Sequence, residues 1–223
     1  MTRFGVVQFP GSCDEVDARK ACERVGDAEL LWHGDHDLKG VDAVVVPGGF
    51  SYGDYLRAGA IARFSPVMET VADFARSGGP VLGICNGFQV LCEAGLLPGA
   101  LLDNLSLRFV CRQVDIEVES RDTIWTRACD DGASLSIPVK HMSGRWYAPD
   151  EMLQRLDANG QIVFRYAAGQ NPNGSLADVA GVSNEAGNVV GLMPHPEHAV
   201  DALTGSTDGG LLFESAARVP AAV

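Results

Sequence analysis

Residues 80–89 have the sequence Pro-Val-Leu-Gly-Ile-Cys-Asn-Gly-Phe-Gln, and the rest of the chain is arranged around this segment. The apolar run 81–84 is typical of a buried strand, and the residues from Asn86 onward are typical of a helix. Cys85 lies at the junction, with one glycine two residues before it and another two residues after it. This pattern predicts a nucleophile elbow, a tight strand-to-helix turn that exposes the thiol and aims the helix N-terminus at it.

The pattern leaves two interpretations of Cys85 open. Free cysteines are more often small buried apolar residues than nucleophiles, so packing alone could account for the residue. At an elbow, however, the first backbone N–H groups of the helix are free to hold an oxyanion, and a thiol beside them is reactive. We favour the nucleophile, because the strand, the two glycines and the helix occur in the order that this chemistry needs.

The composition indicates one globular domain and argues against a nucleic-acid-binding surface. The chain has 223 residues, 46% of them hydrophobic, and we predict a single domain over residues 1–223. The net charge is −12, and only three of the 17 basic residues are lysines, so a basic footprint for nucleic acid is absent. A salt-rich cytoplasm is one hypothesis for this acidity, and an ordinary acidic protein is the alternative.

The six cysteines predict free thiols in a reducing compartment. They include no C-x-x-C pair, and their positions (13, 22, 85, 92, 111 and 129) fit no zinc-binding template. The first residues lack the long apolar stretch of a signal peptide, and no apolar run reaches membrane-spanning length. We therefore expect a cytoplasmic protein that does not enter a membrane.

The first third of the chain alternates between strand and helix patterns. Strands are expected at residues 3–9, 28–32 and 41–46. Helices are expected from a capping box at Ser12–Glu15 to about residue 25, around residues 56–64 and over residues 66–76. With the elbow strand, this alternation predicts an α/β fold in which a mostly parallel sheet has helices on both faces.

The second half carries the patterns of antiparallel strands added to that core. Residues 110–119 alternate between apolar and polar side chains, as a half-exposed strand does. Further strands are expected at residues 134–139, 162–166, 179–182 and 189–193, with a hairpin turn at 185–188. A last helix is expected over residues 208–217, and we expect residues 219–223 to fray.

A second candidate site follows the last of these strands, in the sequence His195-Pro-Glu-His198. A nucleophilic cysteine needs a base, and the base needs a third group that fixes its tautomer. His195 and Glu197 suit these two roles, because the proline between them stiffens the link. Metal binding by His195 and His198 is the competing interpretation, which we rank lower because the helical H-E-x-x-H arrangement is not present.

A third candidate is the glycine pair in Val46-Pro-Gly-Gly49, which follows a strand. Gly49 can present a bare backbone N–H to an oxyanion, with the N–H of Asn86 as the second donor. A plain turn is the alternative, because glycine pairs form many turns.

Three separated motifs together resemble the class I glutamine amidotransferases: Pro47-Gly-Gly-Phe50, Gly83-Ile-Cys-Asn-Gly-Phe-Gln89 and His195-Pro-Glu197. More particular stretches are 49–62, Asn104-x-Ser106-x-x-Phe109 and Asn171-Pro-Asn-Gly-Ser175. These stretches are similar to the glutaminase subunits of phosphoribosylformylglycinamidine synthases, which belong to purine biosynthesis. The resemblance runs from the first predicted strand to the last helix. It implies a single-domain, flavodoxin-like glutamine amidotransferase fold.

The resemblance also implies roles for the candidate residues. Cys85 would attack the side-chain amide of L-glutamine, and the N–H groups of Gly49 and Asn86 would hold the oxyanion. His195, held by Glu197, would pass a proton to the departing ammonia. The thioester on Cys85 would then be hydrolysed to glutamate.

Gln89 matches the family position that contacts the glutamine substrate. The family usually carries His-Gly-Glu-Gly-Arg where this chain has His141-Met-Ser-Gly-Arg145, so a glutamate near the glutamine pocket is missing. Gly144 is left as the candidate for backbone contacts to the substrate. Gln170 stands where an acidic residue commonly precedes Asn-Pro-Asn-Gly-Ser.

The family further implies a partner that consumes the ammonia. This partner would be a large ATP-dependent synthetase subunit that converts phosphoribosylformylglycinamide (FGAR) to phosphoribosylformylglycinamidine (FGAM), with a small accessory subunit beside it. ATP and Mg²⁺ are expected on the synthetase, because this chain has no G-K-[ST] phosphate loop, and we expect no cofactor and no metal here.

Three other functions fit parts of the pattern. An α/β-hydrolase with a cysteine elbow would need its acid well upstream of the histidine, whereas Glu197 follows His195. A DJ-1-like protein usually has a histidine directly after the cysteine, where this chain has Asn86. An inactive interaction module is disfavoured, because Cys85, His195 and Glu197 are all present.

Overall fold

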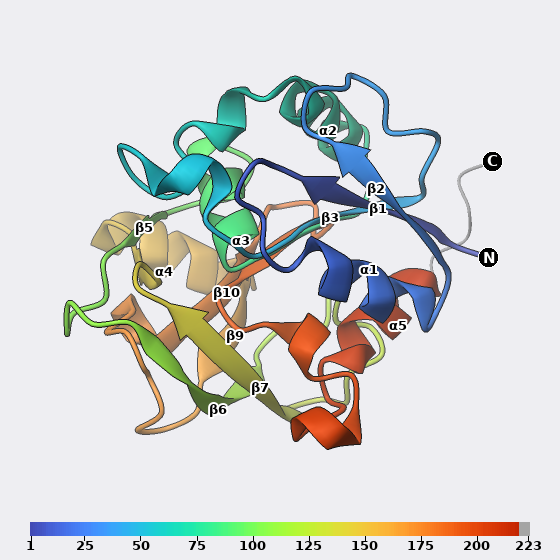
Figure 1. Cartoon of the computed structure of the whole chain (residues 1–223). Helices are drawn as coiled ribbons and strands as arrows, with labels where there is room; N and C mark the ends of the chain where they lie inside the picture. Colours follow the sequence, from blue (N-terminus) through green and yellow to red (C-terminus); the bar gives the residue numbers. More distant parts are fainter. Residues whose placement is uncertain (219–223) are drawn as a thin grey trace.

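The computed structural model describes residues 1–218 and contains one nine-stranded mixed sheet with helices on both faces (Figure 1). The strand order is β2-β1-β3-β4-β11-β10-β9-β6-β7. The expected frayed end, 219–223, lies outside the described residues. The predicted α/β class with a parallel core and added antiparallel strands is confirmed.

Five strands form the parallel part of the sheet: β1 (Arg3–Gln8), β2 (Asp27–Trp32), β3 (Ala43–Val46), β4 (Val81–Ile84) and β11 (Val189–Leu192). The connection from β1 to β2 runs in the opposite direction along the sheet from the connection between β3 and β4. Since such crossovers are right-handed, the helices between these strands lie on opposite faces. The carboxyl ends of β1 and β3 therefore flank a crevice where α/β proteins of this strand order bind ligands.

The helices divide accordingly between the two faces. On one face α1 (Glu15–Glu23) packs on β1 and β2 and lies beside α5 (Gly210–Ala217). On the other face lie α2 (Pro66–Arg76) and α3 (Asn86–Glu93), and α3 packs on β3, β4 and β11. The parallel strands β3, β4 and β11 are buried along their whole length, as strands covered on both faces must be.

The remaining strands of the large sheet pair antiparallel: β10 (Val179–Ser183), β9 (Ile162–Tyr166), β6 (Val110–Val118) and β7 (Ser134–His141). A two-stranded sheet of β5 (Ala100–Leu102) and β8 (Arg145–Tyr147) and the helix α4 (Asp150–Ala158) complete the fold. The sequence patterns did not predict these last three elements. They are short or weakly apolar, and α4 buries Leu156 alone.

Two local predictions were wrong. Residues 56–64 do not form a regular helix, because Leu56 and Gly59 have positive φ and only Ala62–Phe64 complete a 3-10 turn. The capping box is also not formed: α1 begins at Glu15, and neither end of the expected box caps it. The Ser12 hydroxyl instead accepts from the N–H of Phe9.

Within residues 1–218, no helix has both the length and the apolar character that crossing a membrane requires.

Candidate active site

Cys85 lies between β4 and α3, at the elbow that the sequence predicts. Its backbone has φ +50° and ψ −104°, which is strained for a residue with a side chain, and its N–H donates to the carbonyl of Leu192 at 2.8 Å. A Cβ on Gly87 would collide with the carbonyl oxygen of Val46, so α3 can approach β3 this closely only with glycine there. The neighbouring strands therefore hold the strained turn in place.

Two backbone donors are available next to the elbow. The N–H groups of Gly49 and Asn86 donate to no other described residue. Gly49 has φ +147°, and a Cβ there would lie 2.7 Å from the backbone nitrogen of Cys13, so the conformation requires glycine. Asn86 is the first residue of α3, where the helix dipole adds partial positive charge. Both groups have the character of oxyanion donors.

His195 and Glu197 form a close buried pair. Nδ1 of His195 lies 2.6 Å from Oε1 of Glu197, and both residues are at most 3% exposed. A carboxylate only accepts, so Nδ1 carries the hydrogen and Nε2 is the nitrogen free for proton transfer. Nε2 is buried and has no hydrogen-bond partner among the described residues. Burial lowers the pKa of His195, but Glu197 and Cys85 outweigh it and raise the pKa to about 10.

The edge strand β7 contributes the opposite wall of the site. Its Pro138 carbonyl accepts from the N–H of His195 at 2.8 Å, and its Lys140 carbonyl lies 3.9 Å from Sγ of Cys85. Lys140 also extends its ammonium group to Asp14 at 2.5 Å. The antiparallel part of the sheet thus returns to the carboxyl ends of the parallel strands, which explains why the site needs both halves of the fold.

One pocket opens beside Cys85, and Asn86 and Glu197 are not among its lining residues. It is lined by Cys13, Asp14, Gly49, Phe50, Asp54, Cys85, Gln89, Phe109, Lys140, His141, Met142, Ser143 and His195. Cys85, Gly49, Gln89 and His195 come from the predicted set. The acidic and basic members, Asp14, Asp54 and Lys140, were missed as site residues, because nothing local in the sequence marks them.

Gln89 lies in this pocket with both ends of its amide engaged. Oε1 accepts from Nδ2 of Asn86 at 2.9 Å, and Nε2 donates to the carbonyl of Ser143. Gly144 does not line the pocket, in contrast to expectation. Its N–H donates to Oδ1 of Asn104, and its carbonyl accepts from Asn173, so its backbone supports the loop instead.

The departures from the family pattern fall in different places. Met142 and Ser143 line the pocket where the family has Gly-Glu, so this departure alters the site itself. Gln170 pairs with Asp115 on β6 through two hydrogen bonds and does not line the pocket. That second departure is structural.

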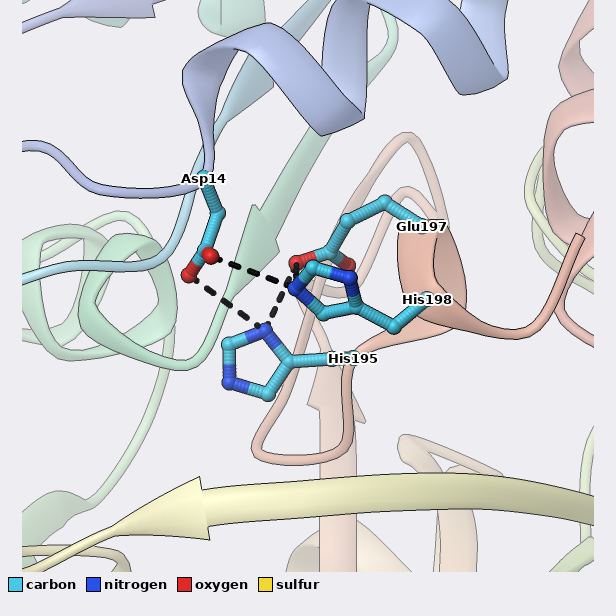
Figure 2. A group of neighbouring side chains, drawn as sticks. All are labelled: Asp14, His195, Glu197 and His198. Carbon is cyan, nitrogen blue, oxygen red and sulfur yellow. Dashed lines mark hydrogen bonds and ion pairs between the residues drawn. The ribbon is translucent and has the colours of Figure 1, made fainter. Parts of the chain in front are cut away.

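Asp14, His195, Glu197 and His198 bring nitrogen and oxygen atoms within 4.8 Å of one another (Figure 2). Such a group can hold a metal ion, but its members already contact one another and Lys140. The Lys140 ammonium neutralises Asp14, and Glu197 uses its hydrogen bond to fix His195. The arrangement fits a hydrogen-bonded charge network better than a set of free ligands.

Comparisons with known proteins agree over nearly the whole chain. A family model for CobB/CobQ-like glutamine amidotransferase domains matches residues 2–210. The phosphoribosylformylglycinamidine synthase subunit PurQ of Mycolicibacterium paratuberculosis is 61% identical over 215 residues, which cover 96% of this chain and 95% of the relative. The same subunit of Streptomyces avermitilis is 59% identical, with coverage of 96% and 95%. The structure of PurLQS from Thermotoga maritima matches with a TM-score of 0.88 at 43% identity, over 97% of this chain and 98% of that one.

Proposed function

The chain belongs to the family of CobB/CobQ-like glutamine amidotransferase domains, and we propose that it is the glutaminase subunit of a phosphoribosylformylglycinamidine synthase. The observation that carries this proposal is the 61% identity to such a subunit over 96% of the chain. The site geometry supports it independently, because Cys85, Gly49 and His195 line one pocket, while Asn86 follows Cys85 at the elbow and Glu197 pairs with His195.

The reaction is hydrolysis of L-glutamine to glutamate and ammonia. Once the thiol proton of Cys85 has passed to Nε2 of His195, Sγ attacks the side-chain amide carbon, and the N–H groups of Gly49 and Asn86 receive the negative charge that develops on the oxygen. His195 gives its Nε2 proton to the departing nitrogen, so that ammonia leaves and a glutamyl thioester remains on Cys85.

Water then completes the cycle. Nε2 of His195 takes a proton from the water that attacks the thioester carbonyl, and the thiolate of Cys85 leaves. Glu197 holds Nδ1 throughout, which keeps the ring in one orientation and stabilises its charged form. Gln89 lines the pocket and fixes Ser143, and we assign it to the glutamine-binding wall.

In this proposal a synthetase subunit consumes the ammonia. The Thermotoga maritima relative is named as a PurLQS complex, and we propose corresponding large and small partner subunits for this chain. ATP and Mg²⁺ then belong to the large subunit, where FGAR is converted to FGAM. Ammonia is protonated in bulk water, so the complex needs a closed passage. A cytoplasmic location is part of the proposal and agrees with six free cysteines.

The test is intact mass after treatment with a glutamine-like diazo-ketone, with and without the synthetase subunits. We expect one adduct that glutamine blocks, that Cys85→Ala abolishes and that synthetase accelerates. Cys13→Ala is the matched control, because Cys13 lines the same pocket and its loss should leave the adduct in place. If the folded protein gives no diazo-ketone adduct even in the presence of authentic synthetase, the assignment as a glutaminase is contradicted.

A further inference from the structure

We propose that Asp14 is a second carboxylate partner of His195, a positioning residue that holds the imidazole in its charged form; this rests on the proposed function. The residue comes from the loop between β1 and α1, and its side chain points at the His195–Glu197 pair (Figure 2). Oδ2 of Asp14 lies 3.6 Å from Nδ1 of His195, the nitrogen that Glu197 holds at 2.6 Å. Two buried carboxylates therefore face one nitrogen.

The two oxygens of Asp14 have different surroundings. Oδ1 accepts from Nζ of Lys140 at 2.5 Å and lies 3.2 Å from Nε2 of His198. These two contacts leave Oδ2 facing His195 without another described polar partner closer than that ring. Burial raises the pKa of Asp14, but His198, His195 and Lys140 outweigh it, so the carboxylate stays charged far below neutral pH.

The backbone keeps the space between Asp14 and His195 open. Asp14 is only 3% exposed, and its N–H donates to the carbonyl of Gly48. A Cβ at Gly48 would collide with Oδ2 of Asp14 and lie 2.6 Å from Cε1 of His195. The glycine therefore allows a close approach that any other residue would block.

Lys140 connects this carboxylate to the nucleophile. Its carbonyl lies 3.9 Å from Sγ of Cys85, and its ammonium group binds Asp14. A single residue of β7 therefore contacts both Cys85 and Asp14. If Asp14 served only packing, its carboxylate would not need to point at the imidazole ring of His195. A charge 3.6 Å from the imidazole, in contrast, favours the imidazolium that a reactive thiolate requires.

The charged and titratable groups around Asp14 set the direction of the test. They are Cys13 and Glu15 beside it, Cys85 at the elbow, Lys140 and His141 on β7, and Glu197 and His198 after β11. Removing the negative charge of Asp14 should make His195 lose its proton at lower pH. Removing the positive charge of Lys140 should do the opposite.

The experiment follows the rate of Cys85 labelling by the diazo-ketone against pH in the complex with synthetase, together with kcat and KM for glutamine. For Asp14→Asn we expect the alkaline limb of the pH–labelling-rate profile to move to lower pH by about one unit. We also expect kcat for glutamine to fall about 10-fold to 100-fold, with KM nearly unchanged. For Lys140→Met, which keeps Asp14, we expect the alkaline limb to move up. Asp73→Asn, which removes an exposed carboxylate on α2 that pairs with Arg76, is the matched control and should shift neither limb.

Each outcome decides the assignment. If the Asp14→Asn limb stays in place while the activity falls only in proportion to folded protein, Asp14 is structural and the inference is overturned. If Asp14→Asn does not fold, Lys140→Met decides alone, and an unmoved or lowered limb overturns the inference. Failure of the wild-type chain to label at all would instead overturn the proposed function.

Discussion

Nδ2 of Asn86 donates a hydrogen bond of 3.2 Å to Oδ1 of Asp54, a carboxylate that has no ion-pair partner among residues 1–218. Asp54 lines the pocket and has φ +53°, so it is both strained and partly desolvated. Burial raises its pKa from 3.8 to about 6, although the bond from Asn86 acts in the other direction. A carboxylate that is kept in a strained and desolvated position does not stabilise the fold, so Asp54 is a candidate for a functional role.

Asp54→Asn should therefore stabilise the protein at neutral and higher pH. The charged form is disfavoured in the folded state, so the penalty is absent below 3.8 and fully present above about 6. After a discount for solvent screening at this half-buried group, we expect a gain of about 1 kcal/mol at about pH 8 and none at about pH 3.5. Urea unfolding measures both. Exposed Asp73→Asn is the control, and an equal gain there would show a general charge effect.

Glu197→Gln should lower kcat by about 10²-fold to 10⁴-fold with little change in KM, as loss of the orienting carboxylate does in related triads. The amide has no charge with which to stabilise the protonated His195, and it can present a donor to Nδ1 and so select the wrong tautomer. Glutaminase assays with the synthetase complex provide the measurement. Glu69→Gln, on the exposed side of α2, should be unaffected. A loss below 10-fold at Glu197 would remove it from the triad.

Gly87→Ala should destabilise the fold and damage the elbow. The added Cβ would overlap the Val46 carbonyl, and neither α3 nor β3 can move away without breaking the sheet contact. We expect a loss of about 3 kcal/mol in unfolding free energy, with slower Cys85 labelling in any folded fraction. Gly210→Ala is the matched control, because open space surrounds that position, and a change within about 0.5 kcal/mol is expected.

Asn104→Ala should loosen the loop that lines the pocket. Asn104 is fully buried and donates to the carbonyls of Arg108 and His141, while its Oδ1 accepts from the N–H of Gly144. Removing these partners leaves buried groups unpaired, which costs about 2–4 kcal/mol. We expect KM for glutamine to rise more than kcat falls, since the pocket is deformed and the triad is not. Exposed Asn159→Ala should change neither quantity, and an equal effect there would contradict this role.

Salt dependence tests the hypothesis of a salt-rich cytoplasm. With a net charge of −12, the folded chain repels itself in dilute buffer, and screening should relieve that repulsion. We expect the urea midpoint to rise between dilute buffer and molar KCl. A midpoint that stays constant or falls would identify an ordinary acidic protein.

Much of the fold followed from local patterns. The strands at 81–84 and 162–166 have the predicted bounds, because short apolar runs bounded by turn residues mark buried strands clearly. Residues 56–64 were misjudged, since their apolar spacing resembles a helix while positive φ at Leu56 and Gly59 prevents one. The glutamine amidotransferase family was likewise predicted from three motifs, and the comparisons confirm it.

The sequence by itself determined the elbow around Cys85 and the link from His195 to Glu197. Both depend on steric and spacing rules that act within a few residues: two glycines around a turn, and one proline between His195 and Glu197. Only the tertiary structure decided which charges surround them. Asp14 and Lys140 are 126 residues apart, and Asp14 reaches His195 because α1 follows β1 at the crevice and β7 returns to it. Such contacts depend on how strands are ordered in the sheet, and no local pattern encodes that order.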